Sequence, residues 1–379
     1  MILNEKTKVG REFTVVMRGP SAAIFRQNEN ILVQGFPSLL GPVKIAYTSR
    51  WIVRSEELTV PGQLWIEIRG EGFSLEDSLV PFANAGLSLL PMLALSANAA
   101  VGESEIEVAF DSSPDVTERD YFQSYIPPES EIVYFARHID IKVTVALLDA
   151  INRHPEAERL HRAVNQYRLA LDGWKLGREA LSLAHLWMAL EALTKAKIRS
   201  ECTARRYDSE SELASALGVE LNLLDSTIRR DFILCGDTEC YRKAKQASDG
   251  FEHGFLGYDK IRDLAKDTRN RMATYIRNAI FELAELETKL LTTLTSDPYD
   301  KPMGHSPIVR YCRGYLLGDS PELAAKGNAY PFMRWKPVIT KCEVTEKGKI
   351  NVEMRENFTA ELGGNIRFQP TSYEAWKPE

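Results

Sequence analysis

Residues Ala180 to Leu193 are the feature that most restricts how this chain can fold. In the segment GREALSLAHLWMALEALTKAKIR, apolar side chains occur at nearly every position of that range. A helix that is apolar on all sides has to be covered on several sides by other parts of the protein. The sequence therefore predicts a central helix with further helices packed around it.

The neighbouring sequence supplies such helices. In ERLHRAVNQYRLAL, apolar residues recur three and four positions apart, and a short break at Asp172–Gly173 makes this helix an antiparallel neighbour of the central one. Further helices are expected over about Ser211–Leu234, interrupted near Gly218, and over about Glu239–Phe251. The run Tyr258–Leu294 has a spacing close to a heptad seam. As one helix it would reach roughly 55 Å, so its second half is expected to pack on another domain or subunit.

Strand-like segments flank the helical region on both sides. Two C-terminal runs, Val338–Val344 and Lys349–Arg355, predict a hairpin with its turn at Glu346–Gly348. A lone hairpin is marginal in water, so it is expected to complete the N-terminal sheet or to pack on the helices. The N-terminal segments rich in β-branched and aromatic residues are Glu12–Met17, Asn30–Phe36, Val43–Arg54, Gln63–Gly70 and Ser104–Phe110.

These patterns predict an α+β protein with three parts. Residues 1–136 form a β-rich N-terminal domain with an apolar helical insertion, residues 137–296 a helical domain, and residues 297–379 a C-terminal extension with the hairpin. A chain of 379 residues is long enough for two or three domains.

The insertion, Ser78–Gly102, is uncharged and could be mistaken for a membrane span. Asn84, Pro91 and Asn98 lie inside it, and such residues are costly or awkward in hydrocarbon. A buried pair of short helices broken near Pro91 is therefore favoured, and no contact with a membrane is expected.

The formal net charge of −6 argues against a protein whose whole surface neutralises phosphates, although it leaves room for a local basic groove. Five cysteines and a polar first ten residues favour reduced thiols in a cytoplasmic protein. Cys235 and Cys240 could bind zinc only with two more ligands, such as Cys202 and His253. A helix junction with Asp237 or Thr238 as N-cap explains that segment better, so no metal and no cofactor are expected.

The helical region resembles the HEPN domain, named for higher eukaryotes and prokaryotes nucleotide-binding. The resemblance lies in the paired helices HRAVNQYRLAL and LAHLWMALEALTKA, followed by a later helix that ends in His253–Gly254. It implies an antiparallel helical bundle, a homodimer and an RNA- or nucleotide-related role in a prokaryote or phage. Many members of the family are metal-independent ribonucleases, often in toxin–antitoxin or antiphage systems.

The family's signature is an Arg, usually followed by Asn, Asp or His, with a His four to six residues further on and commonly a Gly after it. The segment SDGFEHG, Ser248–Gly254, keeps the His at His253, the Gly at Gly254 and an acidic second residue at Asp249, but Ser248 replaces the Arg. Cleaving RNA without a metal needs groups that move protons and a cation beside the phosphate. The side chain of His253 can move protons near neutral pH, but a serine cannot supply the cation.

Other residues of the helical domain could restore the missing function. Lys245 and Arg242 precede Ser248 by three and six residues on the same expected helix, so either could supply the cation. Glu191 could orient the imidazole of His253. Its alternative role is a structural ion pair with a basic residue of a neighbouring helix, such as Arg242.

Two interpretations of function remain open. In the first, an HEPN-like protein binds RNA or a nucleotide, with metal-independent ribonuclease activity undecided. In the second, the helical domain is a non-catalytic assembly module that homodimerises, while the β-rich flanks bind a protein partner. A basic cluster could meet RNA phosphates but is more typical of a solvated helix end, and it comprises Lys195, Lys197, Arg199, Arg205 and Arg206.

Overall fold

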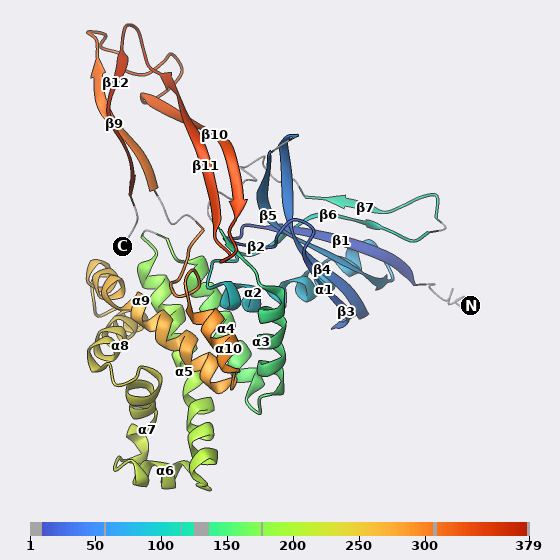
Figure 1. The fold of residues 1–379 in the computed structure, drawn as a ribbon, viewed down its shortest axis with the longest axis vertical. Helices are drawn as coiled ribbons and strands as arrows, with labels where there is room; N and C mark the ends of the chain where they lie inside the picture. The colour runs from blue at the N-terminus through green and yellow to red at the C-terminus, as the bar shows by residue number, and fades with distance from the viewer. Residues whose placement is uncertain are drawn as a thin grey trace, which may run out of the picture.

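The computed structural model describes residues 10–56, 58–114, 116–124, 136–175, 177–305 and 309–376. Strands and helices occupy separate regions of the chain, which confirms the predicted α+β class. Figure 1 shows an N-terminal sheet, a helical bundle beside it, and two long β-ribbons that project away from both.

The N-terminal part is built on an antiparallel six-stranded sheet. Each of the five strands predicted in this part overlaps an observed one. Leu64, Ile66 and Ile68 alternate along one strand and are fully buried, as expected when one face of a sheet is covered. The strands lie in the order β3 (Asn30–Ser38), β4 (Gly41–Ser55), β5 (Leu58–Gly72), β1 (Arg11–Gly19), β6 (Glu105–Asp111) and β7 (Tyr121–Gln123).

Two apolar helices, α1 (Leu75–Leu87) and α2 (Leu90–Ala97), join the sheet to the bundle. Helix α1 packs on the sheet, and α2 packs on the helices that follow. By length and composition this stretch could cross a membrane, but 56% of its most apolar window is buried inside the protein. The predicted buried helix pair is confirmed. The break falls at Ser88–Leu89, however, and Pro91 lies in the first turn of α2, where its missing N–H costs nothing.

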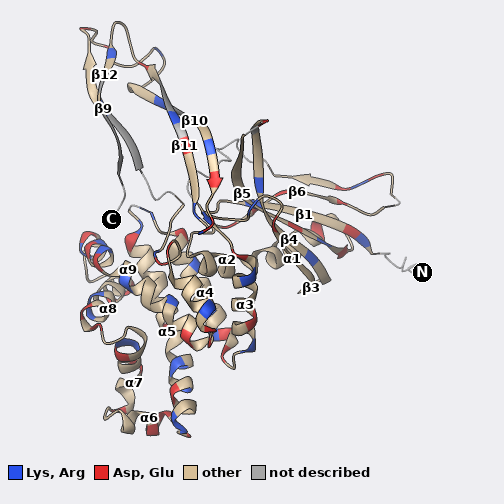
Figure 2. Ribbon diagram, viewed as in Figure 1, with Lys and Arg blue, Asp and Glu red and all other residues tan. Residues whose placement is uncertain are grey.

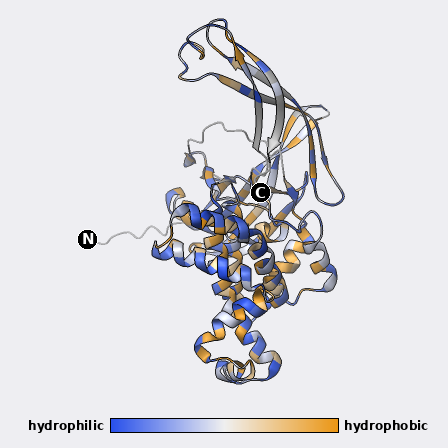
Figure 3. Cartoon of the chain, turned by 90° about the vertical axis from the view of Figure 1, so that its left-hand side faces the viewer, coloured by the Kyte–Doolittle hydropathy of each residue, from blue (hydrophilic) through white to orange (hydrophobic). Residues whose placement is uncertain are grey.

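The bundle is centred on α5 (Glu179–Arg205), which packs against helices on several sides. Leu186, Leu190 and Leu193 of α5 are fully buried, and Figure 3 shows hydrophobic and hydrophilic positions alternating along the helices of the bundle. The other elements are α3 (Ile141–Arg153), α4 (Ala157–Asp172), α6 (Glu210–Ala216), the 3-10 turn Leu221–Leu223, α7 (Leu224–Thr227), the π-helical segment Ile228–Ile233, α8 (Thr238–His253), α9 (Tyr258–Leu283) and α10 (Thr288–Thr295).

The prediction of one helix over Tyr258–Leu294 is wrong. Helix α9 ends at Leu283, and a separate short helix, α10, follows. Glu285 has a φ of 49°, a left-handed backbone conformation that a continuing α-helix cannot contain. With 26 residues, α9 is about 39 Å long and stays within the bundle.

A buried arginine ties α9 to its surroundings. The side chain of Arg277 donates hydrogen bonds to the carbonyl oxygens of Leu95 and Ser96 in α2, and to those of Leu294 and Tyr299. These four bonds are 2.7 to 3.2 Å long. Two of them satisfy the carbonyls of Ser96 and Leu294, which lie in the last turns of α2 and α10 and have no partner within the helix. Burial lowers the pKa of Arg277 to about 10.

Residues 309–376 form two antiparallel ribbons, which we call the C-terminal arm. The ribbons are β10 (Phe332–Val344) with β11 (Ile350–Glu361), and β9 (Val309–Leu317) with β12 (Arg367–Trp376). The predicted hairpin is confirmed and is longer than expected, whereas the β9–β12 ribbon was not predicted. Figure 1 shows both ribbons extending from the body of the molecule.

The hairpin had been expected to complete the six-stranded sheet or to pack on the helices. It does neither, because β10 and β11 form a sheet of their own. Its turn is anchored instead at the base of the arm. Ile350 packs with Ile24 and Ala136, and the backbone N–H of His138 donates to the carbonyl of Gly348 at 2.8 Å. Nearby, two short segments, β2 (Ala23–Ile24) and β8 (Arg137–His138), pair in parallel.

Candidate functional site

The segment SDGFEHG forms the last turns of α8 and its C-terminal cap. Helix α8 starts at the N-cap Asp237, whose carboxylate accepts the backbone N–H of Cys240 at 2.9 Å. It ends at His253, because Gly254 adopts a φ of 67° and donates its N–H to the carbonyl of Gly250. The Gly of the His–Gly pair therefore has a structural role, since glycine adopts this conformation without strain.

The corner between α8 and α9 presents His253 and three aromatic rings to solvent. A Cβ added to Gly250 would come within 2.7 Å of Leu256, so the absence of a side chain lets the corner fold back closely. The side chains of Phe251, Phe255 and Tyr258 are 47%, 61% and 54% exposed. His253 is exposed beside them. This group of exposed rings is typical of a surface that contacts another molecule.

Ser248 points into the protein rather than toward His253. It is 5% exposed, and its hydroxyl donates to the carboxylate of Glu252 at 3.1 Å. An arginine at this position would have to begin from a buried backbone site. The position that the predicted signature would give to an Arg is therefore occupied by a buried, uncharged side chain.

The other predicted residues of α8 share its exposed face. At about 100° per residue, Arg242, Lys245, Asp249 and His253 form one stripe along the helix, which we call the α8 stripe. Lys245 forms an ion pair with Asp249 at 2.5 Å. The stripe spans roughly 16 Å from Arg242 to His253, at about 1.5 Å per residue.

Glu191 lies at a different level of the bundle. Its carboxylate accepts a hydrogen bond from the indole N–H of Trp187 at 3.1 Å and lies 3.5 Å from the guanidinium of Arg229. The ring of Trp187 contacts that of Tyr241, with centroids 5.9 Å apart. Tyr241 precedes His253 by twelve residues, so the level of α8 that this cluster contacts lies roughly 18 Å from His253 along the helix.

The predicted residues are thus partly brought together. Four of them share the α8 stripe, while Glu191 joins a neighbouring cluster with Trp187 and Arg229. The alternative role of Glu191 was a structural ion pair with a basic residue such as Arg242. The structure pairs Glu191 with Arg229 instead. Within one copy of the chain, no predicted cation lies beside His253 in the part of α8 that the structure describes.

A pair of exposed apolar side chains on α5 was not predicted from the sequence. Leu181 and Met188 lie two turns apart on α5 and are 39% and 38% exposed, on a helix that the sequence predicts to be apolar nearly all round and covered on several sides. We call this pair the α5 stripe. The signal was present in the all-round apolar pattern, which includes both positions.

The alternative sites have structural explanations. Cys240 is buried and Cys235 exposed, and within the described residues no group of His, Cys, Asp and Glu is arranged to hold a metal ion. The basic cluster at the end of α5 is largely neutralised by ion pairs. These pairs are Lys195 with Glu210 and Asp225, Lys197 with Glu201 and Glu282, Arg199 with Glu156, and Arg205 with Glu201.

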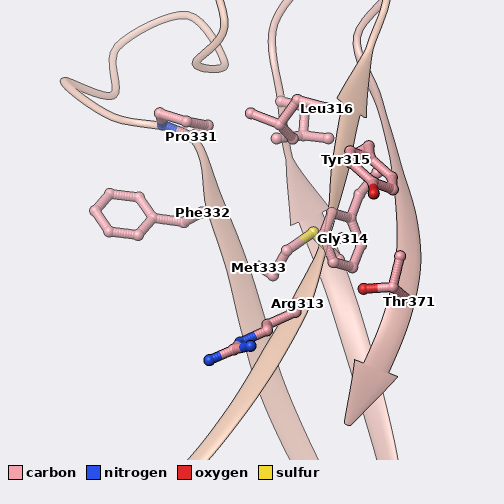
Figure 4. Close-up of a pocket in the computed structure, with 10 residues that line it drawn as sticks. Arg313, Gly314, Tyr315, Leu316, Pro331, Phe332, Met333 and Thr371 are labelled. Atoms are coloured by element: carbon pink, nitrogen blue, oxygen red, sulfur yellow. The ribbon is translucent and has the colours of Figure 1, made fainter.

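Two hollows of the described surface lie away from His253. One, of about 790 Å³, is lined by the corner between α3 and α4, the second half of α5 and the end of α9. It includes Cys202, whose pKa is raised mainly by burial, so that its thiol is a poor nucleophile. The other, shown in Figure 4, lies in the C-terminal arm.

Comparison with protein-family models, with curated proteins and with solved structures found no match for this chain.

Proposed function

We propose that this chain is an HEPN-like protein that acts on RNA as a homodimer joined through the α5 and α8 stripes. The observation that carries the proposal is the open α5 stripe beside a helix that ends in the exposed His253. Removing the exposed apolar side chains of a central helix from water is favourable. A second copy of the same face would provide that cover symmetrically.

A two-fold dimer would also address the missing cation. If two α8 helices lie side by side and antiparallel, Arg242 of a second copy comes level with His253 of the first, because the two positions are the ends of the α8 stripe. Arg242 is exposed, and within the described residues it forms no ion pair. In this arrangement His253 moves a proton and Arg242 stabilises negative charge on the phosphate.

The second candidate function is a non-catalytic assembly protein. Two observations favour it: Lys245 is neutralised by Asp249, and Ser248 is directed inward. Under this alternative the same stripes form the dimer, but the dimer holds no working site. The β-rich parts would then bind a protein partner.

Cleavage of purified total RNA in EDTA separates the two candidates. The nuclease proposal expects the wild-type protein to cut RNA and His253→Ala to lose at least about 100-fold in rate. A matched control is His161→Ala, because His161 lies on α4 and bonds Asn152 far from α8. Equal cutting by the wild type and His253→Ala would leave the assembly function.

A mixing experiment tests the shared site directly. Arg242→Ala and His253→Ala should each be inactive alone, and mixing them should restore part of the activity through dimers that hold one complete site. Met188→Asp should convert the dimer to a monomer in size-exclusion chromatography with light scattering. Activity in a monomer, or no rescue on mixing, would contradict a site built from two copies.

The proposed setting is the cytoplasm of a prokaryotic cell, as part of an antiphage or toxin–antitoxin system. The four cysteines with described side chains are free, which is compatible with a reducing compartment. Measuring survival of cells that express the wild type or His253→Ala, with and without phage infection, tests this setting.

A further inference from the structure

Beyond the first turn of α8, the order of charges along its exposed face is the reverse of the order that a helix favours. The basic Arg242 and Lys245 lie in its N-terminal half, and the acidic Asp249 and Glu252 lie in its last two turns. Free carbonyl groups give the end of a helix partial negative charge, so carboxylates there are unfavourable. A Lys four residues before an acid is also the weaker orientation of such an ion pair. The exposed face of α8 therefore holds an arrangement that its own helix does not favour.

Contacts within the chain offset this arrangement only in part. Lys245 pairs with Asp249, but the two side chains remain 50% and 36% exposed. An ammonium has three donors and a carboxylate has two acceptor oxygens, so each can bind a further partner. Glu252 accepts a hydrogen bond from Ser248, and among the described residues Arg242 forms no ion pair. Charges of both signs therefore remain open to contact along one face.

This face lies on the outside of the molecule. Cys240, Ala244 and Ala247 are buried, and at about 100° per residue they lie on the opposite side of α8 from Arg242 and Asp249. Figure 1 shows α8 at the left-hand edge of the bundle, and Figure 2 shows charged positions of both signs on it. A second chain can therefore approach this face without displacing a helix.

The charges of α8 are symmetric about one level of the helix. Lys245 and Asp249 have their midpoint at Ala247. Arg242 and His253 have theirs half a residue further on, a difference of about 0.8 Å. An antiparallel neighbour reverses the order of residues, so a two-fold axis at the level of Ala247 places the basic half of each helix beside the acidic half of the other. A surface with this symmetry can bind a copy of itself.

We propose that two copies of this chain bind each other along α8 in antiparallel orientation, with Lys245 of each copy facing Asp249 of the other. The order of charges that one helix disfavours becomes favourable in the pair, because opposite charges lie side by side. The macrodipoles of two antiparallel helices also attract each other. This contact rests on the homodimer of the proposed function and fixes its register, which brings Arg242 of one copy level with His253 of the other.

A second copy is the occupant that the charges of α8 select. A polyanion such as RNA would match the basic half of the face and be repelled by the acidic half, and a polycation would do the reverse. A second copy matches both halves, because the two-fold rotation presents the same charges in the opposite order.

Charge reversal, measured by analytical ultracentrifugation of the full chain, tests this register. Lys245→Glu and Asp249→Lys should each raise the Kd of the dimer about tenfold, because two-fold symmetry makes every substitution act twice. An equimolar mixture of the two variants should return the Kd to within about threefold of the wild-type value, since mixed dimers again place opposite charges face to face. The intrachain pair stays broken in both variants, so only a contact between copies explains such a rescue.

Arg205→Glu is the matched control. Arg205 also forms an exposed ion pair with an acid four residues away, Glu201, but it lies at the far end of α5, so its reversal should leave the Kd unchanged. The wild-type dimer should weaken as the salt rises from about 50 to about 500 mM, because salt screens exposed charges. Circular dichroism shows whether each variant keeps its helices.

An unchanged Kd in both single variants, or weakened variants that mixing does not rescue, would overturn the inference. A wild-type protein that stays monomeric at about 100 μM would overturn it together with the proposed homodimer. A charge-dependent dimer that cuts no RNA refutes the nuclease and leaves the contact. Cleavage by a dimer that ignores the charge reversal refutes the contact and leaves the nuclease.

Discussion

The helical bundle and the C-terminal arm are stabilised in opposite ways. In the bundle, long helices bury continuous rows of apolar side chains, and the core runs without a break into α1, α2 and the N-terminal sheet. In the arm, the buried apolar side chains among those described are Ile339, Ile350 and Ile366, each still 7 to 8% exposed. The bundle and the N-terminal sheet therefore share one core, while the arm depends on its anchors at the base.

This difference also sets apart the candidate site. His253 is the last residue of a helix that packs on the bundle, and the proposed proton transfer would need such a fixed position. The hollow of the arm is instead held by two ribbons that have little core.

The largest effect is expected from Arg277→Ala in the bundle. The substitution removes four hydrogen bonds, leaves the carbonyl oxygens of Ser96 and Leu294 without a donor among those described, and opens a cavity, so the free energy of unfolding should fall by about 3–5 kcal/mol. Urea denaturation followed by circular dichroism of the helices measures it. Arg242→Ala is the matched control and should change the value by less than about 0.5 kcal/mol. A loss below about 1 kcal/mol for Arg277→Ala would show that water replaces the guanidinium.

A pair of core truncations compares bundle and arm directly. Leu190→Ala removes a fully buried side chain of α5 and should cost about 2–5 kcal/mol of global stability. Ile339→Ala truncates the sparse core of the arm, so it should leave the unfolding of the helices within about 0.5 kcal/mol and speed proteolysis of the arm. If Ile339→Ala shifts the helical transition as far as Leu190→Ala does, arm and bundle unfold as one unit and the comparison fails.

The sequence predicts the bundle better than the arm for a physical reason. Helix α5 and the strands of the N-terminal sheet carry their pattern locally, in the periodicity of their own side chains. Strand β9 pairs with β12, which lies about 50 residues further along the chain. Gly314 and Pro370 interrupt the strand pattern in those segments, so their pairing has no local marker.

The same distinction holds at the candidate site. Periodicity alone places Arg242, Lys245, Asp249 and His253 on one face of α8. Periodicity cannot show that Lys245 is neutralised. It also cannot show that the partner of Glu191 is Arg229, because Arg229 lies on a π-helical segment that has no sequence marker. Tertiary contacts decide these points.

A pH-dependent effect of intermediate size is expected where the bundle meets the chain that leads to the arm. Asp172, at the end of α4, accepts a hydrogen bond from His305 at 2.7 Å, and this bond is the main reason that the pKa of Asp172 lies below its ordinary value. A depressed native pKa stabilises the folded state above the ordinary pKa of about 3.9, and the stabilisation is lost as the pH falls through the native pKa.

Asp172→Asn should therefore cost about 1 kcal/mol above about pH 5 and progressively less toward pH 2. Thermal unfolding at a series of pH values measures the difference. An equal cost at pH 3 and pH 6 would show that the contact acts through packing rather than through the charge of Asp172.

The smallest effect on stability is expected from Lys245→Ala on the surface of the bundle. The ion pair of Lys245 with Asp249 joins side chains that are 50% and 36% exposed, and such pairs contribute about 0.2–1 kcal/mol, less at high salt. A double-mutant cycle with Asp249→Ala measures the coupling. RNA cleavage by Lys245→Ala is the functional counterpart: unchanged cleavage supports a cation from the second copy, whereas a loss as large as that of His253→Ala would assign the cation to Lys245. These measurements therefore distinguish a proposed site whose cation comes from Lys245 of the same copy from one whose cation comes from a second copy of the chain.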